Sequence, residues 1–299
     1  MELAAPLAGA AGMSGDFVRT PVRRAWHRLL EARARDYTAT SARRRAVVLV
    51  PHPDDETFGA GATIARKCAS GTRVDVVIVT DGRLSHRSQL VSPTELAEMR
   101  ANEARAACAA LGVPAEHVHL LGVPEGTLAA HRTDIQAAVH EIITAAAPHE
   151  ILTTSARDWH EDHQTVAHLA RGFGLAVLEF PIWWWADGPW NRHEPGRGMP
   201  QRLLHLAVEP MQASVAGPVL AVETGGFLDQ KRAAIAAYRS QTTNLTGEAD
   251  WAVLDDAWTG RFLGRREVFF PVADTIVPHP SARTAGNPDR FAHRREGPR

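Results

Sequence analysis

Short apolar runs alternate with amphipathic segments along the first two thirds of the chain. Continuous apolar or β-branched runs occupy residues 46–50, 73–80, 117–123, 150–154 and 175–180. Runs of this length without polar alternation are typical of strands buried on both faces of a parallel sheet. Helical patterns lie between these runs, at residues 57–69, 92–112, 134–147 and 162–172. The alternation predicts an α/β fold, a Rossmann-like doubly wound and mostly parallel sheet.

The start of the second of these helices carries a local signal. Ser92-Pro93-Thr94-Glu95 has capping-box spacing, with proline at the first helical position. After Phe180 the alternation stops, and a stretch rich in Trp, Gly and Pro runs to Pro200. Beyond it we expect strands at 202–209 and 268–272 and a helix at 226–240, which together form an irregular C-terminal extension.

The composition predicts one domain with short flanking segments. We expect a disordered leader at residues 1–18, a single domain at residues 19–277 and a disordered tail at residues 278–299, because the tail has little to bury. The leader lacks the basic start of a secretory signal. A basic amphipathic helix at residues 19–35 is interpreted as packed on the domain surface, and a membrane-surface or partner helix is the alternative.

Charge, hydropathy and cysteine content argue against a nucleic-acid-binding, a membrane-spanning and a disulfide-rich protein. The 33 basic and 34 acidic side chains give a formal net charge of -1, so no global field favours nucleic acid or an anionic membrane. No stretch approaches the roughly 20 apolar residues of a membrane span. The two cysteines, Cys68 and Cys108, do not make a disulfide framework, which favours a cytoplasmic protein. The oligomeric state stays open, a homo-oligomer included.

The first candidate site residues follow the first predicted strand, in Pro51-His52-Pro53-Asp54-Asp55-Glu56. Three carboxylates and a histidine at this point are hard to explain by packing, because burying such groups unpaired costs several kcal/mol. Histidine nitrogen and carboxylate oxygen both ligate zinc, so metal binding explains the cluster. The alternative is a solvated acidic loop that caps the next helix.

A second cluster, Trp159-His160-Glu161-Asp162-His163, follows the fourth predicted strand. Loops that follow different strands of a doubly wound sheet meet at one edge, where ligands bind. Three protein ligands with an open position are the arrangement of a catalytic zinc, whereas a structural zinc has four. The two clusters together therefore predict a catalytic Zn²⁺, and other divalent transition metals would suit the same ligands. On its own, the second cluster would also fit a surface loop with a capping aspartate.

On these motifs the sequence resembles the PIG-L/LmbE-like family of zinc-dependent N-acetylglucosaminyl deacetylases. The resemblance spans residues 45–179, more weakly to residue 272, and the Pro-His-Pro-Asp-Asp-Glu run is specific to that family. It implies that His52, Asp55 and His163 are the zinc ligands.

The resemblance also implies three catalytic residues. Asp54 resembles the general base, a choice over Glu56 that rests on the family match. His160 resembles the histidine that stabilises the oxyanion and donates a proton to the leaving amine. Asp162 matches the residue that lies between them and orients an imidazole.

Three further residues are candidate substrate contacts. Arg100 and Glu103 match the family's Arg-x-x-Glu helix, whose arginine is expected to contact sugar hydroxyls. Without the resemblance they would be interpreted as an ion pair on an exposed helix face, worth a few tenths of a kcal/mol. Glu125 falls where relatives often carry aspartate, which weakens the assignment of its substrate role.

The predicted function is zinc-dependent amide hydrolysis that removes an acetyl or other acyl group from an N-acylated amino sugar, with a small-molecule N-acetylglucosamine conjugate as partner. One alternative is an amidase that acts on a larger conjugate or a thiol S-conjugate. Another is a non-catalytic metal-binding or sugar-binding protein, which would need neither Asp54 nor His160. A nucleotide binder is disfavoured, because Phe58-Gly59-Ala60-Gly61 is only a fragment of the Gly-x-Gly-x-x-Gly motif.

The tryptophans at 183, 184, 185 and 190 follow the fifth predicted strand, so some should overhang the zinc. If the segment is extended, Trp184 points away from Trp183 and Trp185, and at least one ring is partly exposed near the site. Packing and binding of an apolar substituent are both consistent with this cluster.

Overall fold

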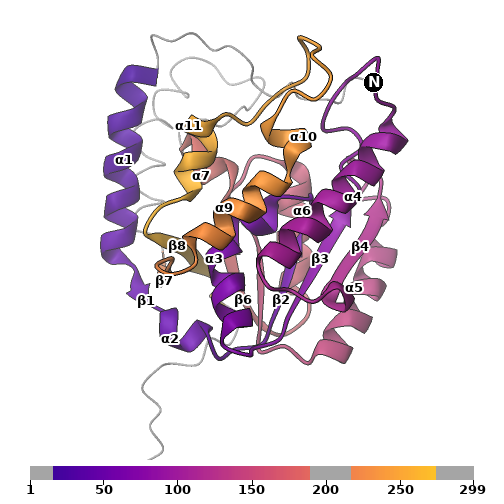
Figure 1. Ribbon diagram of the computed structural model, residues 1–299. Coiled ribbons are helices and arrows are strands. Elements are labelled where there is room, and N and C mark those ends of the chain that lie inside the picture. The colour runs from indigo at the N-terminus through magenta and orange to yellow at the C-terminus, as the bar shows by residue number, and fades with distance from the viewer. Residues whose placement is uncertain (1–15, 189–216, 274–299) are drawn as a thin grey trace, which may run out of the picture.

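One sheet of eight strands runs through the part of the protein that the computed structural model describes, residues 16–188 and 217–273 (Figure 1). Its order is β1-β7-β8-β6-β5-β2-β3-β4. All neighbours pair in parallel except β8, which is antiparallel to both β6 and β7. The strands are β1 (Arg35–Asp36), β2 (Ala46–Val50), β3 (Val74–Thr80), β4 (Val118–Val123), β5 (Glu150–Thr154), β6 (Ala176–Phe180), β7 (Leu220–Glu223) and β8 (Arg266–Pro271).

Helices cover both faces of this sheet. The α-helices are α1 (Asp16–Arg33), α2 (Thr38–Ser41), α3 (Asp55–Ala69), α4 (Pro93–Ala110), α5 (Arg132–Ala146), α6 (Glu161–Arg171), α7 (Trp183–Asp187), α9 (Leu228–Ala237), α10 (Arg239–Thr242) and α11 (Asp256–Thr259). Two short 3₁₀ turns are η1 (Ala115–His117) and η2 (Gly260–Phe262). Figure 1 shows α3, α4 and α9 in front of the sheet and α5 behind it.

Alternate side chains of the central strands supply two separate cores. Val48 and Val50 of β2 belong to the larger core, which includes Ile64 of α3 and Ala104 of α4. Val47 and Leu49, which alternate with them along β2, point the other way. They enter a second core that includes Ile135 and Val139 of α5 and Val166 of α6. A strand buried on both faces needs an unbroken apolar run, which is why these strands were visible in the sequence.

The predicted fold class and the five predicted parallel strands are confirmed, each within a residue at either end. The capping box at Ser92 is also present, with Glu95 as its partner. Helix α1 begins three residues earlier than expected, at Asp16. The strand predicted at 202–209, the tail and most of the leader lie outside the described residues. Strand β7 was not predicted, and with β8 it adds the C-terminal segment to the main sheet.

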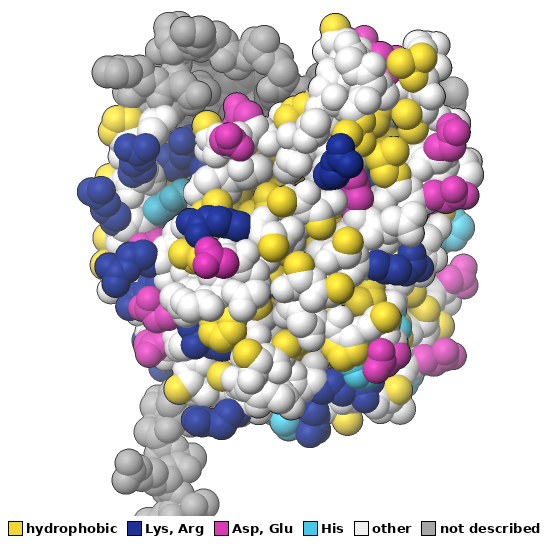
Figure 2. Space-filling model, in the orientation of Figure 1, with side chains coloured by type: hydrophobic (Ala, Val, Ile, Leu, Met, Phe, Trp, Pro, Cys, Tyr) yellow, Lys and Arg dark blue, Asp and Glu magenta, His cyan; other side chains and the backbone are white. Residues whose placement is uncertain are grey.

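The basic helix α1 packs on the domain through part of its apolar side. Trp26 and Leu30 are buried, whereas Val22 and Leu29 remain 52% and 48% exposed. Figure 2 shows basic side chains gathered along the side of the molecule where α1 lies. The interpretation as a surface-packed helix agrees with this arrangement. Among the described helices, none is long and apolar enough to cross a membrane.

Gly59 in helix α3 is required by a close approach to the sheet. A Cβ atom at this position would lie 1.9 Å from the Phe180 ring of β6, and one at Gly61 would lie 3.1 Å from the Lys231 side chain. The glycines that resemble a fragment of a nucleotide-binding motif therefore serve helix packing. They allow α3 to lie close to the sheet and to bring its first residues to the sheet edge.

The only two lysines of the chain are both buried in ion pairs. Lys67 Nζ lies 2.7 Å from Glu150 Oε1 and also donates to two backbone carbonyls. The other oxygen of Glu150 accepts from Tyr37 and Arg44, each at 2.6 Å. Glu150 therefore joins α3, β5 and the segment before β2 at the end of the sheet where β5 begins.

Replacing Glu150 with alanine should destabilise the protein by roughly 3–5 kcal/mol, because it leaves the buried Lys67 ammonium without its partner. Chemical denaturation monitored by circular dichroism measures this loss. Arg232→Ala is the control, since Arg232 pairs with Asp229 on the surface and its loss should cost at most about 1 kcal/mol. Equal effects of the two substitutions would show that the Glu150 cluster does not stabilise the fold.

Candidate metal centre and active site

The two predicted clusters meet at the carboxyl edge of the sheet. His52 follows β2, Asp55 opens α3, and His163 lies in the first turn of α6, which follows β5. Strands β2 and β5 are parallel neighbours, with Leu49 paired to Thr153. Their pairing brings the two following loops side by side, as expected for a doubly wound sheet.

The three predicted ligands form one buried group. Asp55 Oδ2 lies 3.3 Å from His52 Nδ1 and 3.4 Å from His163 Nε2. One ligand atom from each residue lies within 4.8 Å of the others. His163 Nε2 is buried and has no hydrogen-bond partner among the described residues. Buried polar atoms are almost always satisfied, so this nitrogen, facing a carboxylate, fits a divalent metal ligand.

Each candidate histidine ligand contacts a further carboxylate through its other nitrogen. His52 Nε2 lies 3.1 Å from Asp162 Oδ2, and His163 Nδ1 lies 2.8 Å from Asp158 Oδ2. Such carboxylates fix the tautomer and orientation of metal-binding imidazoles. Asp162 was predicted to orient an imidazole, and in the structure that imidazole belongs to His52.

Asp158 is a site residue that the sequence reasoning missed. It is fully buried, and its carboxylate also accepts the backbone N–H groups of Ile182 and Trp184, at 3.0 and 2.8 Å. It therefore links His163 to the segment that follows β6. The available signal was a carboxylate shortly before His160 and His163 in the sequence, but Asp158 precedes α6, so no helical spacing links it to His163.

A second group, His52, Glu125 and His160, also has ligand atoms within 4.8 Å of one another. Its geometry suits a metal less well. His52 Nε2 already contacts Asp162, and His160 Nδ1 accepts the backbone N–H of Asp162 at 3.2 Å. The first group, with its unpartnered buried nitrogen, is the better candidate.

Asp54 has an unusual backbone conformation, with a φ angle of 115° at the residue before α3. Positive φ in a residue other than glycine costs of order 1–3 kcal/mol and is concentrated at functional sites. Its carboxylate lies 3.2 Å from the Arg100 guanidinium, which also donates to the carbonyl of Pro53. Burial raises the pKa of Asp54 to about 8, the Arg100 charge opposes this rise, and the neighbouring Asp55 carboxylate adds to it.

Glu56 is occupied by contacts within the fold. It is completely buried, and it accepts from Thr57 Oγ1 at 2.5 Å, from Tyr238 at 2.7 Å and from the backbone N–H of Asp54 at 3.1 Å. Glu56 therefore holds the turn in which Asp54 lies. Of the two carboxylates, Asp54 is the one with fewer contacts within the protein.

His160 caps helix α6 and lies against the other two histidines. Its ring centroid is 4.7 Å from that of His52 and 5.1 Å from that of His163. Burial lowers the pKa of the His160 imidazole, and the neighbouring His52 and His163 lower it further. Because Nδ1 accepts the Asp162 N–H, the proton of the neutral ring resides on Nε2.

The three predicted substrate contacts occupy different environments. Glu125 lies at the site, with Oε1 3.7 Å from His52 Nε2 and Oε2 accepting the Leu84 N–H. Arg100 is only 2% exposed and holds Asp54. Glu103, 9% exposed, accepts from the backbone and the side chain of Ser240. The alternative interpretation of an ion pair on an exposed face is wrong, because both side chains are buried on different partners.

The tryptophan segment is a short helix, α7, and not the extended segment considered above. Trp184 and Trp185 are buried, whereas Trp183 is half-buried. Trp185 donates to the Arg261 carbonyl and stacks on His27 with ring centroids 3.7 Å apart. The helix turns two rings into the core, and this leaves Trp183 on the outer side. Trp190 lies outside the described residues.

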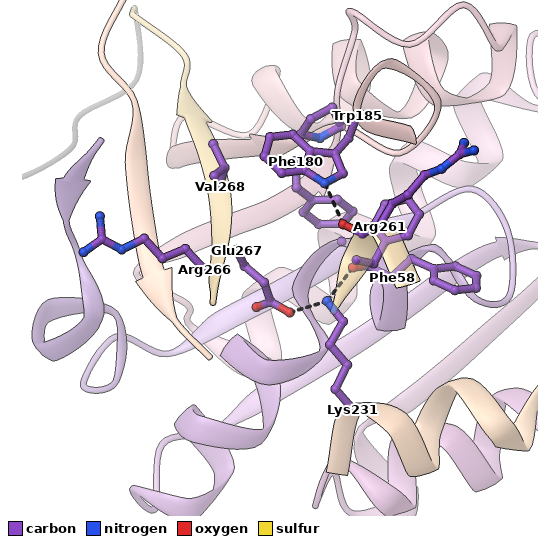
Figure 3. A pocket seen from close by; sticks show the side chains of 11 residues that line it. Phe58, Phe180, Trp185, Lys231, Arg261, Arg266, Glu267 and Val268 are labelled. Carbon is purple, nitrogen blue, oxygen red and sulfur yellow. Dashed lines mark hydrogen bonds and ion pairs between the residues drawn. The ribbon is translucent and has the colours of Figure 1, made fainter. Parts of the chain in front are cut away.

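A small cavity of about 20 Å³ lies between α3, β6 and β8 (Figure 3). Phe58, Phe180 and Trp185 line it, together with Lys231 and Glu267, whose charged atoms are 2.7 Å apart. Its volume holds about one water molecule. Since no predicted site residue lines this cavity, it is a packing gap apart from the candidate metal centre.

Comparison with known proteins connects this geometry to a family. The family described as PIG-L, GlcNAc-PI de-N-acetylase, matches residues 47–173. A 1D-myo-inositol 2-acetamido-2-deoxy-alpha-D-glucopyranoside deacetylase from Thermobifida fusca is 30% identical over 206 residues, which are 60% of this chain and 70% of the relative. A probable N-acetyl-alpha-D-glucosaminyl L-malate deacetylase 2 from Bacillus cereus is 25% identical, over 72% of this chain and 97% of its own.

A solved structure shares the fold. It is the N,N'-diacetylchitobiose deacetylase of Pyrococcus horikoshii, with a TM-score of 0.55 and 17% identity over 89% of this chain and 96% of that chain. At this identity the likeness concerns the fold alone. The Thermobifida fusca relative, at 30% identity over 70% of its length, extends the likeness to the sequence. The resemblance noted from the motifs is thus confirmed, and the chain belongs to the PIG-L family of deacetylases.

Proposed function

We propose that this protein is a zinc-dependent N-deacetylase that hydrolyses the amide of an N-acylated amino-sugar conjugate. The observation that carries the proposal is the buried, unpartnered His163 Nε2, which faces Asp55 and His52 beside a strained aspartate. The named substrates of the two relatives are acetamido sugars joined to a small polar group. An amino-sugar conjugate is therefore the substrate class that this proposal names.

Three atoms would hold the ion: His52 Nδ1, a carboxylate oxygen of Asp55 and His163 Nε2. When bound, the ion supplies Lewis-acid chemistry, polarising the amide carbonyl and making a water molecule more acidic. Asp162 and Asp158 keep the two imidazoles in the tautomers that present those nitrogens.

Asp54 acts as the general base that takes a proton from the attacking water, because the charge of a cation held by the neighbouring Asp55 would lower the raised pKa of Asp54 and leave its carboxylate ionised. Its carboxylate is adjacent to the ligand Asp55 and is held by Arg100. The hydrogen bond from its backbone to Glu56 keeps it in the conformation with positive φ. The resemblance implies that His160 protonates the leaving amine, but the lowered pKa of its imidazole leaves that ring neutral. The proton held at Asp54 is therefore delivered to the amide nitrogen, and the C–N bond breaks to give the amine and the carboxylic acid.

His160 stabilises the charge that develops on the amide oxygen. Its Nε2–H is free to donate because the Asp162 backbone N–H occupies Nδ1. A donor that is fixed before the reaction is effective in a site shielded from water, and loss of one such donor typically costs about 10²–10³ in kcat.

A non-catalytic sugar-binding or metal-binding protein is the competing proposal. It offers no reason for the strained Asp54, since a binding site needs no proton acceptor beside the metal. An amidase for a larger conjugate remains compatible with the same centre. The cytoplasmic location, the lack of a nucleic-acid partner and the oligomeric state stay predictions.

Asp54→Asn should keep the metal and lose roughly 10²–10⁴-fold in kcat, because positioned acid–base groups contribute that much. Asp55→Asn should lose metal affinity together with activity. Elemental analysis of dialysed protein and amine release from N-acetylglucosamine conjugates measure the two properties. Asp229→Asn, an exposed carboxylate on α9, is the control. Equal metal loss in the Asp54 and Asp55 variants would mean that Asp54 is a ligand and not the base.

Asp158→Asn should weaken metal binding by about 10–100-fold, as is typical for the outer partner of a histidine ligand. Competition with a chromophoric chelator gives the affinity. Asp75→Asn is a matched control, because Asp75 is also a buried carboxylate that contacts two histidines, His117 and His119, away from this centre. Unchanged affinity in the Asp158 variant would show that it only organises the loop.

A further inference from the structure

Three half-buried tryptophans form a continuous aromatic surface that leads away from the candidate metal centre. Trp159 and Trp183 have ring centroids 5.2 Å apart, and those of Trp183 and Trp258 are 5.6 Å apart. We call Trp159, Trp183 and Trp258 the tryptophan wall. They come from three separate segments: the loop after β5, the first residue of α7 and helix α11.

The wall begins at the candidate catalytic histidine. The Trp159 ring centroid lies 5.8 Å from that of His160, which in turn contacts His52. At its far end, Trp258 is supported by Phe58 and Phe262, at 5.1 and 4.9 Å. A substrate held at His160 would therefore lie beside the Trp159 ring, and Phe58 and Phe262 hold the far end of the wall.

The opposite side of the centre carries charged groups as well as the exposed Leu84 and Leu90. The sheet order β6-β5-β2-β3-β4 places the candidate metal ligands after β2 and β5, Trp159 and Trp183 after β5 and β6, and other loops after β3 and β4. Those loops carry the paired Asp81 and Arg83 and, next to His52, Glu125. Charged groups that lie next to the candidate ligands are thus on the side of β3 and β4, and the rings of Trp159 and Trp183 are on the side of β5 and β6.

An N-acylated amino sugar also has a polar part and an apolar part, on opposite sides of its amide group. The group is planar and trans, so the substituents on its carbon and its nitrogen point in opposite directions. In an N-acylated amino sugar, the nitrogen side carries hydroxyl groups and the carbon side carries the acyl chain. Hydroxyl groups match the side of Glu125 and Arg83, and an acyl chain matches the tryptophan wall.

We propose that the tryptophan wall binds the acyl chain of the substrate, so that the preferred substrates are amino sugars carrying a straight acyl chain of several methylenes in place of acetyl. The proposal rests on the proposed function and names its acyl specificity. The reaction is unchanged: water adds to the carbonyl carbon, the C–N bond breaks, and the products are a fatty acid and the free amine.

The test compares four substrates with the metal-loaded protein. Three are N-acetyl, N-butanoyl and N-octanoyl glucosamine as methyl glycosides, and the fourth is the octyl glycoside of N-acetylglucosamine. Amine release gives kcat/KM for each. Full burial of one methylene is worth roughly fourfold, so the octanoyl substrate should exceed the acetyl substrate by at least about tenfold even with partial burial.

The variants separate binding from packing. Trp183→Leu and Trp258→Leu should lower the ratio of octanoyl to acetyl kcat/KM by at least about fivefold, and Trp183→Phe, which keeps a ring, should retain most of it. Phe227→Leu is the matched control and should leave the ratio unchanged, because Phe227 is a half-buried aromatic that contacts Arg66 away from the centre. Circular dichroism confirms that each variant is folded.

Three results would overturn the proposal. One is a wild-type protein that prefers the acetyl substrate. Another is a set of wall variants that impair the octyl glycoside and not the octanoyl amide, which would place the aglycone on the wall. The third is a ratio that none of the substitutions changes. Failure of the proposed function gives a different result, namely no amine from any substrate, acetyl included, with the metal-loaded protein.

Discussion

The site depends on one tight turn, in which the chain leaves β2 and enters α3 with Asp54 at positive φ. This turn brings His52 and Asp55 together, and the Asp55 carboxylate accepts the His52 backbone N–H at 3.1 Å. Glu56 holds the Asp54 N–H from one side, and Arg100 holds its carboxylate from the other. A positive φ in a residue other than glycine persists only where neighbouring groups hold the backbone in that conformation. Here the buried side chains of Glu56 in α3 and Arg100 in α4 do so.

The residues that support this turn come from distant parts of the chain. Tyr238, which follows α9, donates to Glu56, and Ser240 of α10 donates to Glu103 beside Arg100 on α4. The segment from 217 to 273 therefore supplies hydrogen bonds that support the site residues of α3 and α4, and it also adds β7 and β8 to the sheet. Asp158 supports the other candidate ligand, because its carboxylate contacts the His163 ring and accepts the Trp184 N–H at the start of α7.

Much of the fold could be predicted because parallel strands buried on both faces leave continuous apolar runs. That two clusters of histidines and carboxylates meet in one candidate metal site could be predicted, because charged residues at these strand ends have no packing explanation, whereas the choice of His52, Asp55 and His163 as ligands rests on the family resemblance. Strand β7 could not, since its four residues lie next to a region without a clear period. Tyr238 and Asp158 also escaped prediction, because a single tyrosine or aspartate has meaning only after folding brings it to Glu56 or His163.

The secondary structure of the tryptophan segment also could not be predicted from the spacing of its apolar residues. Three consecutive bulky rings predict neither a strand nor a helix, because both conformations bury some of them. The deciding contacts are long-range: Asp158 accepts the Trp184 N–H, and Trp26 of α1 packs against the Trp184 ring at 4.4 Å. The resulting helix sends Trp184 inward and leaves Trp183 beside Trp159.

The central claim is that a metal ion is held by His52, Asp55 and His163, with Asp54 and His160 left to act on the substrate. Anomalous diffraction at the zinc absorption edge, on crystals of the zinc-loaded protein, tests it most directly. An anomalous peak is expected between His52 Nδ1, the Asp55 carboxylate and His163 Nε2, with the Asp54 carboxylate beside the metal and not bound to it. A peak between His52 Nε2, Glu125 and His160 would contradict the account, because the residues assigned to catalysis and substrate would then be the ligands.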